Sequence, residues 1–544
     1  MDARKKELPS RPNLEQYKKQ AKDLVRAFKS ADSDTLQRVE KSHPHAENLL
    51  SPNILKAKFA LADAQLIVAR EHGFDSWPKF AKRIETLKRE SSAASASDEL
   101  EEFIEAASVP LDAHSTGTLE RAEAILAAHP EIAAFDIYSA ATLGDDAAVR
   151  RWLALDPQNA TAKGGLRDWD ALTYLCFSRY LRLDRTRSAG FVRAATALLD
   201  AGASASTGYF EPAHQPEPEF ESALYGAAGV ARHVELTRLL LTRGADANNG
   251  EVVYHAPESY DNSVVKVLVE SGRLTQDSLA TMLLRKHDWH DYEGIKWLLE
   301  HGADPNRMTH WHRTALHQAV TRDNSLEIFE VALDHGADPT LVAEGKSVIA
   351  IAARKGRGDL LELFERRGIA VDLRGKDQLL AACARGDAEA VRSTVPHEPG
   401  VVKEVLADGG KLLAEFSGNG NTEGVRRLLD LGVDVASQFS DGDNYWDVAK
   451  NSTALHVAAW RARHSTVKLL IERRAPVDAL DNKGRTPLAL AVRACVDSYW
   501  KDRRSPESVE ALLVAGASVS GVDFPSGYAG VDELLRCHAN KMGS

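Results

Sequence analysis

The sequence predicts an all-α solenoid of helix–turn–helix repeats with short hairpin loops, preceded by a small helical N-terminal domain. At 544 residues the chain is too long for one hydrophobic core, because cores stop growing near about 250 to 300 residues. A helix ending of two leucines followed shortly by Gly-Ala recurs along the chain, and segments of the type Thr-Ala-Leu-His precede several of these endings. Self-similarity of this kind is the signature of a repeat array.

Composition limits the kind of protein this is. The chain is 44% hydrophobic and 27% charged, which is ordinary for a folded protein. Its net charge of -11 argues against nucleic acid as a partner, because such binding usually needs a basic face. No window holds about 18 consecutive apolar residues, so no membrane span is expected. The four cysteines form no C-x-x-C pair and indicate a reducing compartment, so we expect a cytoplasmic protein; they are Cys176, Cys383, Cys495 and Cys537.

Residues 1–90 are expected to form the helical N-terminal domain. Asn13 is a candidate N-cap for a helix whose apolar positions recur at helical spacing up to Phe28. A second helical stretch, residues 54–72, ends at Gly73, a residue suited to a helix C-terminus. Three aromatic residues after this glycine are expected to pack in a core: Phe74, Trp77 and Phe80.

The next segment is small and polar. Residues 91–98 read SSAASASD, and we expect a flexible linker there. The repeat array should then occupy residues 99–544. Residues 1–90 carry 19 Lys and Arg against 13 Asp and Glu, so the N-terminal region is basic while the remainder is acidic.

Within the array, five repeats are clear and others are degenerate. The clear repeats are expected at residues 221–250, 279–306, 312–340, 451–480 and 484–520. Degenerate repeats are expected at residues 345–372, 376–400 and 409–437, and residues 99–206 match more weakly. Two departures from the pattern are candidate partner contacts: the Pro-rich segment 207–220 and the insert between Val492 and Ser508.

The repeated segments resemble the ankyrin family. The resemblance lies in TALHQAV (314–320), TALHVAA (453–459), LLTRGADAN (240–248) and LLEHGADPN (298–306). It implies stacked helical pairs with a concave face that binds a protein, and structural roles for His317 and His456. The N-terminal region, through LPSRPNLEQYKKQAKDL, is similar to a segment that precedes the repeats in some bacterial ankyrin proteins, which implies a bacterial source.

One local cluster suggests chemistry. The segment KHDWHDYEG (286–294) places two histidines three positions apart beside aspartates, a set that could hold zinc or another divalent ion. Counting back from Gly302 puts Thr281 at the start of the repeat, so His287 should end the first helix and Trp289 should lie in the following turn. Third and fourth ligands are missing from the sequence, and turns of solenoids are commonly rich in such residues. We therefore predict neither a metal centre nor a cofactor.

A second interpretation joins this turn to aromatic and histidine residues of the neighbouring repeats. Such patches anchor partners well, because Trp and Tyr bring a large contact area at low entropy cost. The alternative is that each ring simply packs on its neighbour. The predicted binding residues are Tyr254, His255, His287, Trp289, His290, Asp291, Trp311 and His312.

The sequence therefore predicts a non-enzymatic scaffold or adaptor that binds another protein, with no catalytic residues. One alternative is a metal- or small-molecule-binding enzyme built on His287, His290 and Asp291, with Tyr254 and Trp311 lining its site. Another is that the basic N-terminal region binds an acidic surface while the repeats bind a protein.

Overall fold

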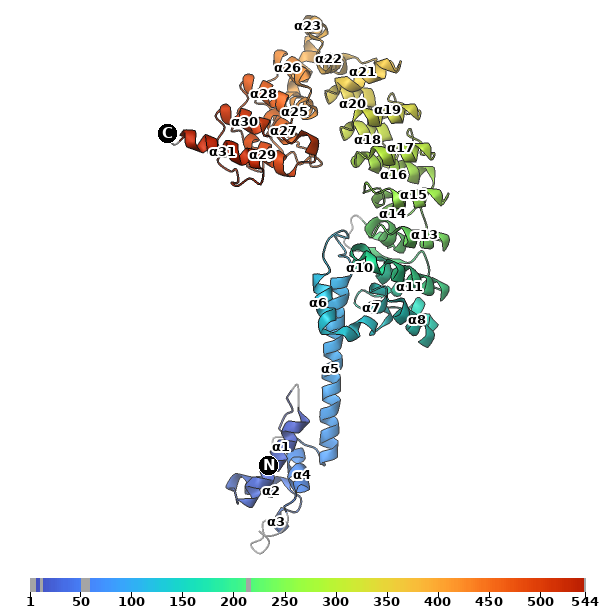
Figure 1. Ribbon diagram of the computed structural model, residues 1–544, viewed down its shortest axis with the longest axis vertical. Coiled ribbons are helices and arrows are strands. Elements are labelled where there is room, and N and C mark those ends of the chain that lie inside the picture. The colour runs from blue at the N-terminus through green and yellow to red at the C-terminus, as the bar shows by residue number, and fades with distance from the viewer. Residues whose placement is uncertain (1–5, 10–12, 50–58, 212–216, 543–544) are drawn as a thin grey trace. The chain divides into compact units, whose positions relative to one another are not determined.

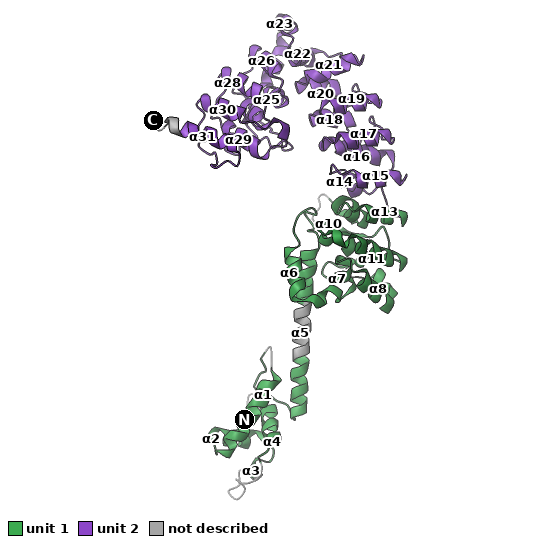
Figure 2. Cartoon of the chain, viewed as in Figure 1, with its two compact units in different colours: residues 1–243 green, residues 244–544 purple. Residues whose placement is uncertain are grey.

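The computed structural model describes residues 6–9, 13–49, 59–211 and 217–542 (Figure 1). The chain packs into two compact units, Met1–Arg243 and Gly244–Ser544 (Figure 2). Both units are built almost entirely from helices, and the strands form two-stranded antiparallel hairpins. The predicted all-α class is therefore confirmed.

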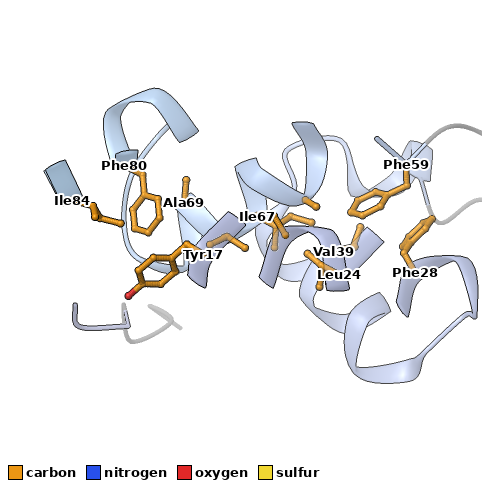
Figure 3. Packing of buried hydrophobic residues seen from close by; sticks show 12 residues of the cluster. Tyr17, Leu24, Phe28, Val39, Phe59, Ile67, Ala69, Phe80 and Ile84 are labelled. Carbon is orange, nitrogen blue, oxygen red and sulfur yellow. The ribbon is translucent and has the colours of Figure 1, made fainter. Parts of the chain in front are cut away.

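Unit 1 begins with helices that share a core of their own. They are α1 (Leu14–Lys29), α2 (Ser33–Ser42), α3 (Ala46–Leu49), α4 (Leu61–Glu71) and the start of α5 (Trp77–Ala107). Asn13 caps α1 by accepting a hydrogen bond from the Glu15 backbone at 2.9 Å, as predicted. Figure 3 shows the buried cluster, in which the rings of Tyr17 and Phe80 lie 5.1 Å apart. Phe74 and Trp77 pack against this cluster, so the predicted aromatic core is confirmed.

Two boundaries in this region differ from the prediction. The helix expected from residue 54 begins at Leu61, and residues 54–58 lie outside the described residues. The expected flexible linker, residues 91–98, lies inside the continuous helix α5. The physical reason is local: the linker contains neither Gly nor Pro and has three alanines, the best helix formers, so nothing in it stops a helix.

The rest of unit 1 contains irregular helical pairs. Its helices are α6 (Glu120–Ala128), η1 (Pro130–Ala134), α7 (Ile137–Thr142), α8 (Asp146–Leu155), η2 (Pro157–Ala160), α9 (Ala171–Cys176), α10 (Arg179–Leu183), η3 (Arg185–Arg187), α11 (Ser188–Asp200), α12 (Ala223–Tyr225), η4 (Gly226–Val230) and α13 (Val234–Thr242). Its hairpins pair β1 (Lys163–Gly164) with β2 (Trp169–Asp170) and β3 (Gly208–Glu211) with β4 (Glu219–Ser222). The two ends of the Pro-rich segment 207–220 therefore lie in strands that pair with each other.

Unit 2 is a series of helical pairs. Its helices are α14 (Gly250–His255), α15 (Ser263–Glu270), α16 (Gln276–Asp288), α17 (Tyr292–Glu300), α18 (Ala315–Thr321), α19 (Leu326–Asp334), α20 (Val348–Arg354), α21 (Gly358–Arg366), α22 (Gly375–Ala384), α23 (Ala388–His397), α24 (Pro399–Ala407), α25 (Gly409–Asn419), α26 (Thr422–Asp430), α27 (Ala454–Trp460), α28 (His464–Glu472), α29 (Pro487–Asp497), η5 (Lys501–Arg503), α30 (Glu507–Val514) and α31 (Ala529–Met542). Its hairpins pair β5 (Val342–Ala343) with β6 (Lys346–Ser347) and β7 (Gln438–Phe439) with β8 (Ser452–Thr453).

The repeat motif has a clear local cause. Thr314 caps α18, and its Oγ1 lies 2.7 Å from Nδ1 of His317, whose Nε2 lies 3.2 Å from the Lys346 carbonyl oxygen of the next repeat. His456 makes the equivalent contacts with Thr453 and with the Arg485 carbonyl. These two histidines therefore join neighbouring repeats, which is the structural role that the resemblance implied.

One helical pair was not predicted from the sequence. α14 and α15 form a pair between the expected repeats 221–250 and 279–306, and Asn249 rather than a threonine caps α14. The next pair also begins earlier than expected. Thr275 caps α16, so Thr281 lies buried inside that helix instead of starting it.

Candidate binding groove

The histidine and aspartate cluster lies where α16 ends and α17 begins, as predicted. His287 is fully buried in the last turn of α16, and its Nδ1 lies 2.8 Å from Oδ1 of Asn324. Since the amide nitrogen of Asn324 donates to the His287 carbonyl, the amide oxygen accepts from Nδ1–H of a neutral imidazole. Burial lowers the pKa of His287 to about 4. This side chain therefore holds two turns together.

His290 and Asp291 also have structural roles in this turn. His290 adopts a left-handed backbone conformation with φ of 51°, and burial lowers its pKa to about 4. Asp291 caps α17 by accepting from the Gly294 backbone at 3.0 Å, and it forms a buried ion pair with Lys286 at 2.7 Å. Asn262 also donates to Asp291, at 2.9 Å.

The metal hypothesis needs these three side chains to converge, and they do not. His287 is directed to Asn324, while the Asp291 carboxylate already accepts from three groups. Among the described residues, no group of three or more His, Cys, Asp or Glu side chains is placed to hold a metal ion. The geometry thus gives the metal-binding alternative no ligand set.

Tyr254 and Trp311 meet at a pocket of about 280 Å³. Their ring centroids are 5.7 Å apart, and the Arg285 guanidinium lies over the Tyr254 ring at 3.9 Å. Arg285 also pairs with Asp288, which accepts from Arg322 at 2.7 Å. The complete lining is Tyr254, Leu284, Arg285, Asp288, Trp311, Arg313, Gln318, Arg322 and Glu344.

The other predicted binding residues lie outside this pocket. His255 is held between Glu251 at 3.1 Å and Glu258 at 2.9 Å. Although burial opposes it, hydrogen bonding to the two carboxylates raises the pKa of His255 to about 9. Trp289 packs edge-on against Tyr260, with centroids 5.7 Å apart. His312 is exposed in a turn.

A second pocket of about 280 Å³ adjoins the first, because Glu344 lines both. Its lining residues are Thr321, Ala343, Glu344, Lys346, Ile351, Arg354, Lys355, Lys376, Asp408, Lys411, Leu412 and Glu415. These residues come from successive repeats, so the two neighbouring pockets follow the array. We call this pair of pockets the basic groove.

The repeats of unit 2 also contact each other over long sequence distances. Arg461, in the turn after α27, pairs with Asp323 in the turn after α18 at 2.8 Å, and both side chains are buried. Lys355 lies 3.5 Å from Asp323 and 2.7 Å from Glu415. These ion pairs connect repeats that are far apart in the sequence.

Aromatic side chains extend the same contact. Tyr445 donates to the Asp288 carbonyl, and Arg322 lies over its ring at 3.7 Å. The ring of His290 lies 5.8 Å from that of Trp446 and 5.4 Å from that of Tyr499. We call this surface the closing interface; its residues are Tyr260, His290, Arg322, Asp323, Tyr445, Trp446, Arg461 and Tyr499. Tyr499 belongs to the insert predicted as a partner contact, and the structure places it against the chain's own repeats.

Comparison with known proteins agrees with this architecture. The family model described as ankyrin repeats (3 copies) matches residues 282–375, 379–472 and 438–523. Serine/threonine-protein kinase 12 of Arabidopsis thaliana is 40% identical over 85 residues, which are 16% of this chain and 17% of the kinase. Neurogenic locus notch homolog protein 1 of Danio rerio is 31% identical over 144 residues, which are 24% of this chain and 6% of that protein.

The chain therefore contains ankyrin repeats, in the part that the family model matches, residues 282–375 and 379–523. It covers less than a fifth of the length of either relative. Of the helices that the structure describes, none is long and apolar enough to cross a membrane.

Proposed function

We propose that this protein is a non-enzymatic scaffold or adaptor whose basic groove binds another protein. The basic groove itself is the observation that carries the proposal. It runs along successive repeats and combines two aromatic side chains, Tyr254 and Trp311, with many cationic ones. Ankyrin repeats are interaction modules, and aromatic and arginine side chains dominate binding energy at interfaces.

The burial of three of the four cysteines supports a non-enzymatic role, while the fourth, Cys537, is exposed near the end of α31. A reactive cysteine needs an accessible thiolate. Burial raises the pKa of the Cys176 thiol, that of Cys383 to about 12 and that of Cys495 to about 11. His317 and His456 are occupied in holding repeats together.

The domain division forms part of the proposal. Residues 1–90 would form a domain of their own, supported by a buried cluster whose members lie between Tyr17 and Ile84. Residues 99–544 would form the repeat array. The cysteines are unpaired, which supports a reducing compartment such as the cytoplasm. The bacterial source implied by the N-terminal segment belongs to the same proposal.

Affinity purification from the native host, followed by mass spectrometry, tests the function. The full chain is compared with the variant Tyr254→Ala/Trp311→Ala, which removes both rings of the groove. Phe135→Ala is the matched control, because this exposed ring lies between η1 and α7 of unit 1, outside both predicted partner contacts. Substituting His290 would be a poorer choice, since His290 also belongs to the closing interface.

A partner recovered by the wild type and by Phe135→Ala, and lost by the folded double variant, supports the proposal. Folding of each variant is checked by circular dichroism and thermal melting. Recovery of no protein above a scrambled-surface control would count against an adaptor role. Equal recovery by all three chains would move the binding surface away from the groove.

A further inference from the structure

The basic groove is charged opposite to the molecule as a whole. Three arginines line the first pocket, and five further Lys and Arg residues line the second, which makes eight cations. Four carboxylates line the groove: Asp288, Glu344, Asp408 and Glu415. The excess is therefore positive, although the chain carries a net charge of -11. Such a local reversal of sign focuses the electrostatic field toward an anionic ligand.

Only some of these cations take part in ion pairs, although Lys411 also acts on Asp408 through space. Lys376 pairs with Asp408, and Lys355 pairs with Glu415. Arg354 pairs with Asp377, which lies outside the lining. By contrast, Lys346 and Lys411 form no ion pair with any residue that the structure describes. Lys346 lies in the β5–β6 hairpin and Lys411 in α25, so these two cations come from different repeats.

The chain itself shows which side chain suits the edge of this groove. The Tyr445 ring lies against the Arg322 guanidinium at 3.7 Å, and its hydroxyl donates to the Asp288 carbonyl. Arg322 and Asp288 also line the first pocket. Tyr445 belongs to the segment 443–447, which reads DNYWD and places aromatic side chains between aspartates. An acidic segment bearing an aromatic ring is therefore already accommodated beside the groove.

We propose that the basic groove binds an extended, acidic protein segment that carries an aromatic side chain. The aromatic side chain would pack in the first pocket, against Tyr254 and Trp311, and carboxylates would face Lys346 and Lys411 in the second. This inference rests on the proposed function, since it names the chemistry of the partner for the same groove. Aromatic anchoring supplies most of the affinity in such interfaces, while charge complementarity gives specificity and a fast on-rate.

A protein segment fits this groove better than a nucleic acid does. Nucleic acids carry a charge on every phosphate, and affinity for them grows with the number of phosphates that cations neutralise. Here four carboxylates line the groove together with the cations and would repel a continuous row of phosphates. A peptide, unlike a nucleic acid, can carry carboxylates at a few positions only, so that they meet Lys346 and Lys411 and no other part of the groove.

The probe is a fluorescently labelled random copolymer of glutamate and tyrosine, compared with polyglutamate and with single-stranded DNA of similar length. Binding to the full-length protein is measured by fluorescence anisotropy at about 0.05 M and about 0.3 M salt, because screening weakens exposed charge pairs. The groove variant is Lys346→Glu/Lys411→Glu. The control variant, Lys266→Glu/Lys296→Glu, makes the same charge change on α15 and α17, away from the groove lining.

We expect the copolymer to bind wild type more tightly than polyglutamate does, and less tightly at the higher salt. The groove variant should lose about tenfold or more in affinity, which corresponds to about 1.4 kcal/mol. The control variant should stay within about twofold of wild type.

Three results would overturn the inference: no copolymer binding at about 0.05 M salt, equal loss in both variants, or DNA binding as tight as copolymer binding. The proposed function is judged separately by partner capture. If the copolymer fails but a captured protein depends on Trp311, the charge argument is wrong and the adaptor role stands. If both measurements are negative, both proposals fail.

Discussion

Replacing His287 should change how the stability of unit 2 depends on pH. His287 is fully buried and neutral, with a pKa of about 4 in the folded protein, against about 6.5 for an unperturbed histidine. The unfolded chain therefore binds this proton more readily than the folded one. It follows that stability is complete above pH 6.5 and is lost as the pH falls from 6.5 to 4.

The size of the effect follows from the difference between the two pKa values. Each pKa unit corresponds to about 1.4 kcal/mol, so the full loss below pH 4 is about 3 kcal/mol, and about 2 kcal/mol is already lost at pH 5. His287→Gln removes the titrating group and keeps a neutral side chain that can bond Asn324. The variant should lose about 2 kcal/mol less than wild type between pH 7.5 and pH 5.0.

Urea denaturation followed by tryptophan fluorescence measures this difference at the two pH values. His255→Gln is an informative control, because the raised pKa of His255 acts in the opposite direction. Its stabilising effect is fully present below pH 6.5 and is lost as the pH rises through 9, so its removal should enlarge the loss on acidification. Equal acid sensitivity of wild type and His287→Gln would refute the reasoning.

Three further perturbations follow from the contacts described above. Asp323→Asn should destabilise unit 2 by about 3 kcal/mol, because it leaves the buried Arg461 without its carboxylate, and Arg461→Met should cost less, because Lys355 still lies 3.5 Å from Asp323. A double-mutant cycle should show coupling between them, and strictly additive effects would contradict the ion pair. Phe80→Ala should cost about 3 to 5 kcal/mol in the N-terminal core. Trypsin should then cut residues 1–90 faster, and an unchanged cleavage rate would argue against a shared core there. Gly302→Ala should cost about 1 kcal/mol in thermal melting, because this residue has φ of 89°. An unaltered melting temperature would mean that the turn adapts.

The sequence predicts those parts of the fold that have local causes. Thr314 with His317 recurs as Thr453 with His456 because each pair caps a helix and reaches the next repeat. The second helix of a repeat, such as α17, is followed by a glycine such as Gly302, where a left-handed residue is needed. The α14–α15 pair lacks the threonine, so the pattern misses it.

The candidate site was only partly predictable. Tyr254 and Trp311 stood out as aromatic departures from the repeat pattern, and they do line one pocket. His287 and Asp291 stood out equally, yet they bond neighbouring turns and do not line the pocket. Local sequence cannot distinguish these cases, because the partner of His287 is Asn324, 37 positions away.

The closing interface could not be predicted from the sequence, for a related reason. Arg461 and Asp323 are 138 positions apart, and each by itself resembles an ordinary charged turn residue. Their pairing depends on how many repeats stack between them, which no local pattern encodes. The same holds for Tyr445 and the Asp288 carbonyl.

The closing interface has a mechanical consequence. An open stack of repeats stretches like a spring, since each repeat contacts only its neighbours and can yield independently. Here Arg461 ties Asp323 across 138 positions, so the repeats between them are shielded from an end-to-end pull until that tie breaks. The extension would then come as one large step, and on release the tie would re-form last, after a long loop has closed. Under load, unit 2 should therefore extend in one large step and refold with hysteresis, instead of extending elastically.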